Sequence, residues 1–303
     1  MGRGGEPIAF RSVLGSHGLA RLAPNEIDAE KTELTTTFLL GRSARTVRFT
    51  ENPRHMIAVR FADRGAKEPT PKERAALAAI VRTVFSLDDD LAPFYAAIAD
   101  DEDLSFATRG VGRMYRSPTA FEDVVRTICT TNCAWSGTTR MIEALVAHLG
   151  ERAPGAPTSG WRGRAFPTPG AMAGAAEHFY SDVARAGYRG AYLRKLAELT
   201  SDKVIDLEAW RAAPRDALSD EELEERLLEL PGVGPYAAAH VMLLFGRHSR
   251  LVFDSWTRPF YAELMNKKKM TDRAIARRFK KYGADAGLAF WLILWKERHL
   301  AIA

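Results

Sequence analysis

The sequence predicts an α+β protein, in which a small antiparallel sheet precedes an all-helical core. Between residues 10 and 61, short runs rich in β-branched and aromatic residues alternate with turn residues. From Pro71 onward, apolar residues recur at helical spacing between capping residues and glycines. We therefore expect an N-terminal β-rich lobe over residues 1–68 and a helical core over residues 69–303.

Three runs in the first lobe predict strands, and turn residues separate them. Gly41-Arg-Ser and Glu51-Asn-Pro are typical of turns, and the stretch from Arg64 to Pro71 is the expected linker to the helical core. The predicted strands are Thr35–Leu40, Thr46–Thr50 and His55–Phe61.

The helical region begins with a strong start signal. Thr70 is followed by Pro71 and Glu73, which predicts an N-cap, a first-turn proline and a capping box. We expect the next major helix to start in a similar way at Ser117-Pro-Thr-Ala. Gly150 is expected to end a helix with an apolar stripe. An irregular loop is expected over residues 151–169, which are rich in proline and glycine.

Composition limits the classes of function. The chain has 303 residues, 46% of them apolar, and a net charge of +5, which suits a soluble protein and permits nucleic-acid binding without proving it. No apolar run approaches the length of a membrane span of about 18 residues. The N-terminal stretch lacks the apolar segment of a secretory signal, so we expect a cytoplasmic monomer with no membrane association.

The two cysteines exclude one cofactor. Cys129 and Cys133 are four residues apart in one predicted helix, where backbone geometry rarely permits a disulfide. Two thiols cannot supply the four ligands of an iron–sulfur cluster. We therefore expect two small buried side chains and no required cofactor.

The most informative segment is Leu230-Pro-Gly-Val-Gly-Pro-Tyr236, which predicts two helices joined by a tight hairpin. Gly232 and Gly234 can both take a positive φ, and the N–H groups at the mouth of the second helix suit a phosphate oxygen. Asp254 follows 20 residues after Gly234. An anion-binding hairpin followed by one carboxylate indicates an enzyme that acts on a nucleic-acid backbone.

These residues resemble the helix-hairpin-helix (HhH-GPD) superfamily of DNA glycosylases, whose motif is LPGVG followed by a catalytic Asp about twenty residues later. Ser117–Cys129 is similar to the first core helices of this superfamily, and Gly187–Leu193 is similar to its "GYR…YL" element. Ser16–Pro24 and Leu87–Phe94 look like the branch that acts on alkylated purines.

The resemblance implies a monofunctional DNA glycosylase. Such an enzyme extrudes a damaged purine from double-stranded DNA and hydrolyses its N-glycosidic bond in base excision repair. Alkylated purines are the first expectation, and oxidised or deaminated purines such as 8-oxoguanine or hypoxanthine are the alternative. A protein that uses the hairpin only to bind DNA remains a third interpretation.

By the same resemblance, Asp254 is the catalytic residue, although it could instead cap the next helix. Tyr236 stands where relatives that also cut the strand carry a nucleophilic lysine, and without an amine no Schiff base can form. Tyr236, His240 and Trp135 are expected to line the base pocket, with a structural role in the core as the alternative for each. Alkyl-purine relatives often carry an aromatic residue near Asp285, and its absence here argues against a pocket that stacks cationic alkylated bases. Asp285 is included in the pocket as a carboxylate that could instead recognise a protonated or amino-bearing base.

Three further roles follow from the resemblance. Asn132 lies where the superfamily places the residue that fills the gap left by the extruded base, and an asparagine there matches the 8-oxoguanine branch. DNA phosphate is expected on the N–H groups of Gly232, Gly234 and Tyr236. The backbone carbonyls of three residues could hold a Na⁺ or K⁺ ion when DNA is bound, namely Leu228, Leu230 and Val233. The basic run over residues 266–281 could add affinity for DNA.

Overall fold

The α+β prediction is confirmed by the computed structural model, which describes residues 1–52, 56–63 and 65–300. One four-stranded antiparallel sheet has the order β1-β2-β3-β4. The strands are β1 (Glu26–Asp28), β2 (Glu33–Leu40), β3 (Ser43–Glu51) and β4 (Ile57–Phe61). The first two predicted strands fall in β2 and β3. Of the third, residues 57–61 form β4, Met56 precedes that strand, and His55 lies outside the described residues.

Helices make up most of the remaining described chain. The α-helices are α1 (Phe10–Leu14), α2 (Pro71–Val84), α3 (Ala92–Ala97), α4 (Ala120–Thr130), α5 (Trp135–Leu149), α6 (Pro169–Ala173), α7 (Arg189–Ser201), α8 (Leu207–Ala212), α9 (Asp220–Leu228), α10 (Pro235–Leu244), α11 (Thr257–Leu264), α12 (Asp272–Phe279) and α13 (Ala286–Leu300). Short 3₁₀ or π turns are η1 (Gly18–Arg21), η2 (Ser105–Arg109), η3 (Phe179–Val183) and η4 (Lys280–Asp285).

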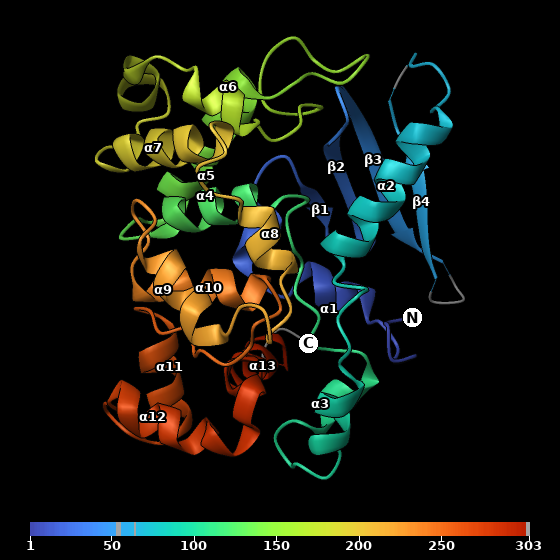
Figure 1. Ribbon diagram of the computed structural model, residues 1–303. Helices are drawn as coiled ribbons and strands as arrows, with labels where there is room; N and C mark the ends of the chain where they lie inside the picture. The colour runs from blue at the N-terminus through green and yellow to red at the C-terminus, as the bar shows by residue number, and fades with distance from the viewer. Residues whose placement is uncertain (53–55, 64, 301–303) are drawn as a thin grey trace.

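The sheet packs against α2, which lies across it in Figure 1. Leu34 pairs with Phe49 between β2 and β3, and both side chains are fully buried. Phe49 and Phe85 meet edge to face with their ring centroids 5.2 Å apart, while Phe10 of α1 joins the same cluster. The strands end at Phe61, before the boundary predicted at residue 68, whereas the apolar core of the sheet continues into α2.

The second core is formed mainly by the helices from α4 onward, which lie beside the sheet in Figure 1, and it also includes residues of the N-terminal segment and of α3. Val124 and Ile128 of α4, Leu243 of α10 and Leu288 of α13 are fully buried there. Because α10 is surrounded by this core, the hairpin at its start is held on a rigid element. The irregular loop expected over residues 151–169 contains only an isolated β-bridge, and Gly150 ends α5 as predicted.

The caps that begin the helices agree with the sequence in one case and correct it in another. Thr70 and Glu73 form the predicted capping box of α2. The second helix was expected to start in the same way at Ser117, but its cap is Thr119, whose Oγ1 accepts from the Glu122 N–H at 3.2 Å. The Ser117 N–H instead donates to Asp123 Oδ1 at 2.8 Å, so Ser117 is bound to the helix from outside it.

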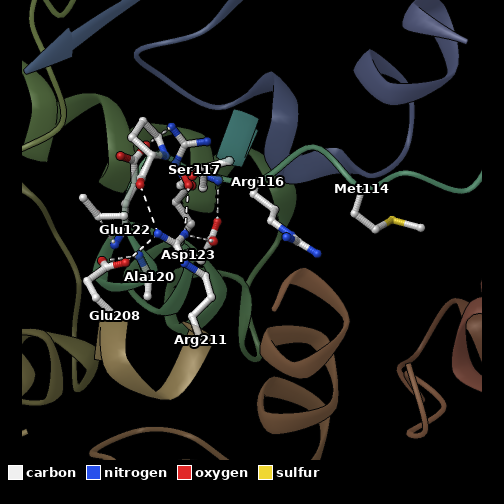
Figure 2. A network of polar contacts seen from close by, with 12 residues as sticks. Met114, Arg116, Ser117, Ala120, Glu122, Asp123, Glu208 and Arg211 are labelled. Atoms are coloured by element: carbon white, nitrogen blue, oxygen red, sulfur yellow. Dashed lines mark hydrogen bonds and ion pairs between the residues drawn. The ribbon is translucent and has the colours of Figure 1, made fainter. Parts of the chain in front are cut away.

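A network of charged side chains surrounds the start of α4, as Figure 2 shows. Arg211 of α8 donates to the carbonyls of Ser117 and Pro118 and lies 3.7 Å from the Asp123 carboxylate. Glu208 of α8 accepts from the Ala120 N–H at 2.6 Å. These contacts bind α8 to the first turn of α4, and the one with Glu208 satisfies an N–H group that a helix start leaves without a partner.

The two cysteines do not share a helix face, which corrects the sequence-based expectation. Helix α4 ends at Thr130, and Cys133 lies in the turn before α5. Asn132 between them has a φ of 45°, which breaks the helix. Both thiols are free, and burial raises the pKa of Cys129 to about 12, so that thiol stays protonated at neutral pH.

The segment over residues 15–25 links the two cores. Arg126 of α4, which is 1% exposed, donates to the carbonyls of Leu19 at 3.0 Å and Ala23 at 3.1 Å. It also forms an ion pair with Glu122 one helical turn earlier. One buried guanidinium therefore fixes the N-terminal segment against the helical core.

Arg126→Met should lower the free energy of unfolding by about 3–5 kcal/mol, because it leaves a buried carboxylate without its cation and two carbonyls without donors. Urea unfolding monitored by circular dichroism measures the change. Arg74→Met, at an exposed arginine paired with exposed Glu68, is the matched control and should change stability by less than about 0.5 kcal/mol. A loss below about 1 kcal/mol in Arg126→Met would show that the guanidinium does not hold the segment.

Candidate functional site

A cleft of about 2370 Å³ lies where the N-terminal segment meets the helical core. Its lining includes residues 14–19, the turn between α4 and α5, the hairpin with the first turns of α10, residues 253–258, and α13. Residues 7–12, parts of the segment 21–51, Arg109, and Tyr188 and Tyr192 at α7 also line it. The cleft is several times larger than a typical small-molecule pocket, which suits a macromolecular substrate. Arginines but no lysines are present among the described residues that line it.

The hairpin between α9 and α10 forms one edge of the cleft. Gly232 has a φ of +78°, a conformation that glycine adopts readily. A Cβ there would lie 2.7 Å from Cδ2 of Tyr192. Gly234 has a φ of −106° and a ψ of −176°, so it does not take a positive φ. A Cβ on Gly234 would meet nothing within 4 Å, so there is open space beside this residue.

Groups at the start of α10 are available to an anion. Within the described residues, the backbone N–H groups of Gly232 and Gly234 donate to no protein acceptor. Tyr236 is in the first turn of α10, where N–H groups have no partner within the helix. The positive end of the helix dipole adds to this preference for negative charge.

Asp254 lies on the cleft wall just before α11. Its Oδ1 accepts from the backbone N–H groups of Trp256 at 2.8 Å and Thr257 at 2.6 Å, and its own N–H donates to Thr257 Oγ1 at 2.9 Å. The capping alternative for Asp254 thus describes part of its role. Its Oδ2 accepts no hydrogen bond from the described residues, so the orientation is fixed by one oxygen and the other is available for chemistry.

Tyr236 and His240 lie on the same face of α10 and line the cleft together. Tyr236 Oη is 3.2 Å from Thr130 Oγ1 and 3.3 Å from His240 Nδ1. Burial raises the pKa of Tyr236, as does the negative charge of Asp254 to a smaller extent, while the hydrogen bond with Thr130 opposes them. The phenol therefore stays protonated at neutral pH.

His17 is a cleft residue that the sequence reasoning did not single out. Its ring meets that of His240 edge to face, with the centroids 5.8 Å apart. Burial lowers the pKa of His17 to about 3 and that of His240 to about 4, so both rings are neutral at pH 7. Ser16-His-Gly in the sequence was noted only as part of a family stretch, and nothing in its spacing relates it to a residue more than 200 positions away.

Trp291 of α13 completes this inner group and was also missed as a site residue. Its Nε1 donates to the Ser16 carbonyl at 2.8 Å, and its ring centroid is 5.8 Å from that of His240. The apolar neighbours of Trp291 in the sequence indicate only a core helix. Its place beside the N-terminal segment depends on long-range packing.

Asn132 and Trp135 also line the cleft. Asn132 is exposed in its left-handed turn, which Arg189 fixes by donating to the Asn132 carbonyl at 2.9 Å. Trp135 is 48% exposed, so the alternative that it belongs to the core is wrong. Its ring covers Gly18, where a Cβ would lie 2.9 Å from Cη2 of the indole.

Other candidates lie elsewhere or remain untested. Asp285 does not line the cleft, and its Oδ1 is 3.3 Å from His248 Nδ1, so the structure does not bring it to the expected base pocket. The described residues of the basic run 266–281 do not line the cleft either.

The three residues expected to bind a cation do line the cleft: Leu228, Leu230 and Val233. The Leu230 carbonyl already accepts from the Val233 N–H at 3.1 Å, which leaves one lone pair on that oxygen.

The described residues contain no cluster of three or more His, Cys, Asp or Glu side chains that could hold a metal ion. Among the described helices, none combines the length and the apolar character that crossing a bilayer requires.

Comparisons with known proteins support the fold. No family model matches the chain. A curated protein of Methanothermobacter thermautotrophicus, the probable N-glycosylase/DNA lyase, is 28% identical over 232 residues, which are 68% of this chain and 70% of that protein.

Two solved structures extend the likeness over nearly the whole chain. The Clostridium acetobutylicum 8-oxoguanine glycosylase/lyase in complex with DNA has a TM-score of 0.72 at 17% identity and covers 98% of this chain and 93% of its own. The Archaeoglobus fulgidus 3-methyladenine DNA glycosylase has a TM-score of 0.69 at 19% identity, with 99% and 98% covered. The chain therefore has the fold to which the hairpin motif pointed.

Gly232→Ala should lower the free energy of unfolding by about 1–2 kcal/mol, because a Cβ at a φ of +78° is strained and meets the Tyr192 ring. Gly234→Ala is the matched substitution two residues away and should cost less than about 1 kcal/mol. Thermal and urea unfolding of both variants measure the difference. Equal losses in the two variants would contradict the described conformation of the hairpin.

The buried neutral state of His17 predicts a pH dependence. The pKa of its ring falls from 6.5 to about 3 on folding, so the unfolded chain binds the proton first as the pH falls. The free energy of unfolding is therefore unaffected by this ring above pH 6.5. Between pH 6.5 and about pH 3 it falls as the pH falls, by up to about 1.4 kcal/mol per pH unit. His17→Gln should therefore lose less stability than the wild type between pH 6 and pH 4 in urea unfolding. Parallel curves for the two proteins would contradict the burial of a neutral ring.

Proposed function

We propose that this chain, which has the fold of the helix-hairpin-helix DNA glycosylases, is a monofunctional DNA glycosylase that acts in base excision repair. It would extrude a damaged purine from double-stranded DNA and hydrolyse its N-glycosidic bond. The placement of Asp254 carries this proposal. Its carboxylate is oriented by two backbone N–H groups and lies on the wall of a cleft that the hairpin also lines, where unpaired N–H groups would suit a phosphate.

Asp254 would act through its negative charge. Cleavage of an N-glycosidic bond passes through a sugar with oxocarbenium character, and a fixed carboxylate stabilises that charge without reorganisation during the reaction. The same group can orient the water that attacks C1′. Because the two N–H donors bind Oδ1 alone, Oδ2 remains able to face the sugar or the water.

The hairpin would hold the DNA while the base leaves the duplex. Unstacking a base costs a few kcal/mol, and less for a damaged or mispaired one. Phosphate bound by the N–H groups of Gly232, Gly234 and Tyr236 would offset part of this cost. The open space beside Gly234 would allow a phosphate to approach the backbone closely. A Na⁺ or K⁺ ion on the carbonyls of Leu228, Leu230 and Val233 remains a proposal for the DNA-bound state.

Hydrolysis without strand cleavage is proposed from the residues of the cleft. The curated relative and the Clostridium structure both carry the word lyase in their names. In this chain Tyr236 stands at the position where relatives with that activity have lysine, and no lysine is among the described residues that line the cleft. A Schiff base needs an amine, so water is the proposed nucleophile and an abasic site the product.

Alkylated purines remain the first proposed substrate class because of the resemblance in the N-terminal segment. Oxidised purines are the second candidate, and the position of Asn132 at the cleft edge favours them. The fold itself does not separate the two classes, since one similar structure is an 8-oxoguanine enzyme and the other a 3-methyladenine enzyme.

Asp254→Asn should lower the single-turnover rate of base release by at least about 100-fold and leave the Kd for lesion-containing duplex within about threefold. The amide oxygen can still accept the two backbone hydrogen bonds, so the cap and the fold are retained. The measurement combines base release with fluorescence anisotropy.

Asp101→Asn is the control for this substitution, since Asp101 pairs with Lys281 and does not line the cleft. It should retain the wild-type rate. If wild type and Asp254→Asn bind DNA equally and neither releases a base from any lesion, the chain is a binding protein and the proposed function is wrong.

A further inference from the structure

The inner end of the cleft presents two hydrogen-bond acceptors that the protein does not satisfy, on His17 and His240. We propose that these two histidines recognise an exocyclic amino group of the extruded base, so that amino-bearing purines are the substrate class. The inference rests on the proposed function and makes it more specific.

The tautomer of His17 follows from its single polar contact. Its Nε2 lies 2.6 Å from the Tyr115 carbonyl oxygen, which can only accept. Nε2 must therefore carry the hydrogen and donate it. In a neutral ring this leaves Nδ1 with a lone pair, as an acceptor.

The tautomer of His240 follows from a chain of three hydrogen bonds. Thr130 Oγ1 donates to the Thr127 carbonyl at 2.6 Å, so it accepts at its contact with Tyr236. The Tyr236 hydroxyl donates its one hydrogen to Thr130, and its oxygen therefore accepts from His240 Nδ1 at 3.3 Å. A neutral His240 that donates through Nδ1 has its lone pair on Nε2.

Both lone pairs are buried and accept no hydrogen bond from the described residues. His17 is 7% exposed and His240 is 5% exposed, and neither His17 Nδ1 nor His240 Nε2 has a partner. The nearby indole N–H of Trp291 is already used on the Ser16 carbonyl. A buried polar atom without a partner is costly, and a hydrogen-bond donor on a ligand would remove that cost.

A base can reach these nitrogens only from the cleft, which both side chains line. The two rings are in edge-to-face contact, so one of them must turn slightly when a base enters. Such a contact contributes about 0.5–1.5 kcal/mol. Hydrogen bonds to two previously unpaired acceptors would offset that loss.

The required ligand group is a donor without a competing acceptor at the same atom. An exocyclic amino group offers two N–H bonds and suits a pair of acceptors, whereas a carbonyl oxygen would repel both lone pairs. Adenine- and guanine-derived lesions such as 3-methyladenine, 7-methylguanine and 8-oxoguanine carry a free amino group. Hypoxanthine, uracil and 1,N6-ethenoadenine do not.

The test compares single-turnover base release from duplexes that carry each lesion and its analogue with hydrogen in place of the amino group. The wild type should prefer the amino-bearing member of a pair by roughly 10–100-fold, because the analogue leaves both acceptors unpaired. His17→Phe and His240→Phe keep an aromatic ring and remove the free acceptor. Each also removes one hydrogen bond within the protein, to the Tyr115 carbonyl or to the Tyr236 hydroxyl.

Each of these variants should reduce the preference for the amino-bearing base at least about fivefold, mainly by slowing release of that base. His248→Gln is the control, since His248 is also buried but does not line the cleft, and it should retain the wild-type preference. Thermal unfolding confirms that each variant is folded. If one fails to fold, the other carries the test.

The outcomes separate this inference from the proposed function. Base release by the wild type with no preference for the amino group, or a preference unchanged in both histidine variants, would overturn the role of the two histidines and leave the glycosylase intact. A wild-type protein that releases no base from any duplex would overturn both.

Discussion

The buried guanidinium of Arg126 is the interaction on which the rest of the site depends. It binds the N-terminal segment to α4 through the carbonyls of Leu19 and Ala23. That segment carries His17 into the cleft and passes between the apolar core of the sheet and the apolar core of the helices. A sheet lobe distant from the hairpin in the sequence thus supplies a wall of the candidate base pocket.

The helical core imposes a complementary constraint. Helix α10 is almost wholly buried, so the hairpin before it, Tyr236 and His240 on it, and Asp254 beyond it keep fixed relative positions. Pre-organisation of this kind is what a reaction with a charged transition state requires, because the protein groups do not reorganise as charge develops. The flexible part of the process would then be the DNA, whose nucleotide must leave the duplex.

Local chemistry made much of this architecture predictable. Thr70 with Pro71 and Glu73 gives a capping box, and Leu230 to Tyr236 gives a hairpin, because each signal lies within a few residues of the structure it forms. The turn at Asn132 was missed, since no short-range rule ends α4 at Thr130 and leaves Cys133 outside the helix. Gly232 and Gly234 can both take a positive φ, and of the two Gly232 does, because the residue type shows what the backbone can do and not which glycine does it.

Long-range contacts limited the prediction of the site. Tyr236 and His240 could be related by one helical turn, and both line the cleft. His17 and Trp291 could not be related to them, because their meeting depends on the path of the N-terminal segment through the molecule. Asp285 is near the expected pocket in the family pattern, yet here it contacts His248 outside the cleft.

The most direct test of the central claim is a base-release assay whose products are divided and analysed with and without hot alkali. Duplexes would each carry one lesion from the alkylated, oxidised and deaminated classes. The account predicts strand breaks only after alkali, because water attacks the sugar and leaves an intact strand with an abasic site. Breaks that appear without alkali would contradict it, since they would require an amine nucleophile that the described cleft does not contain.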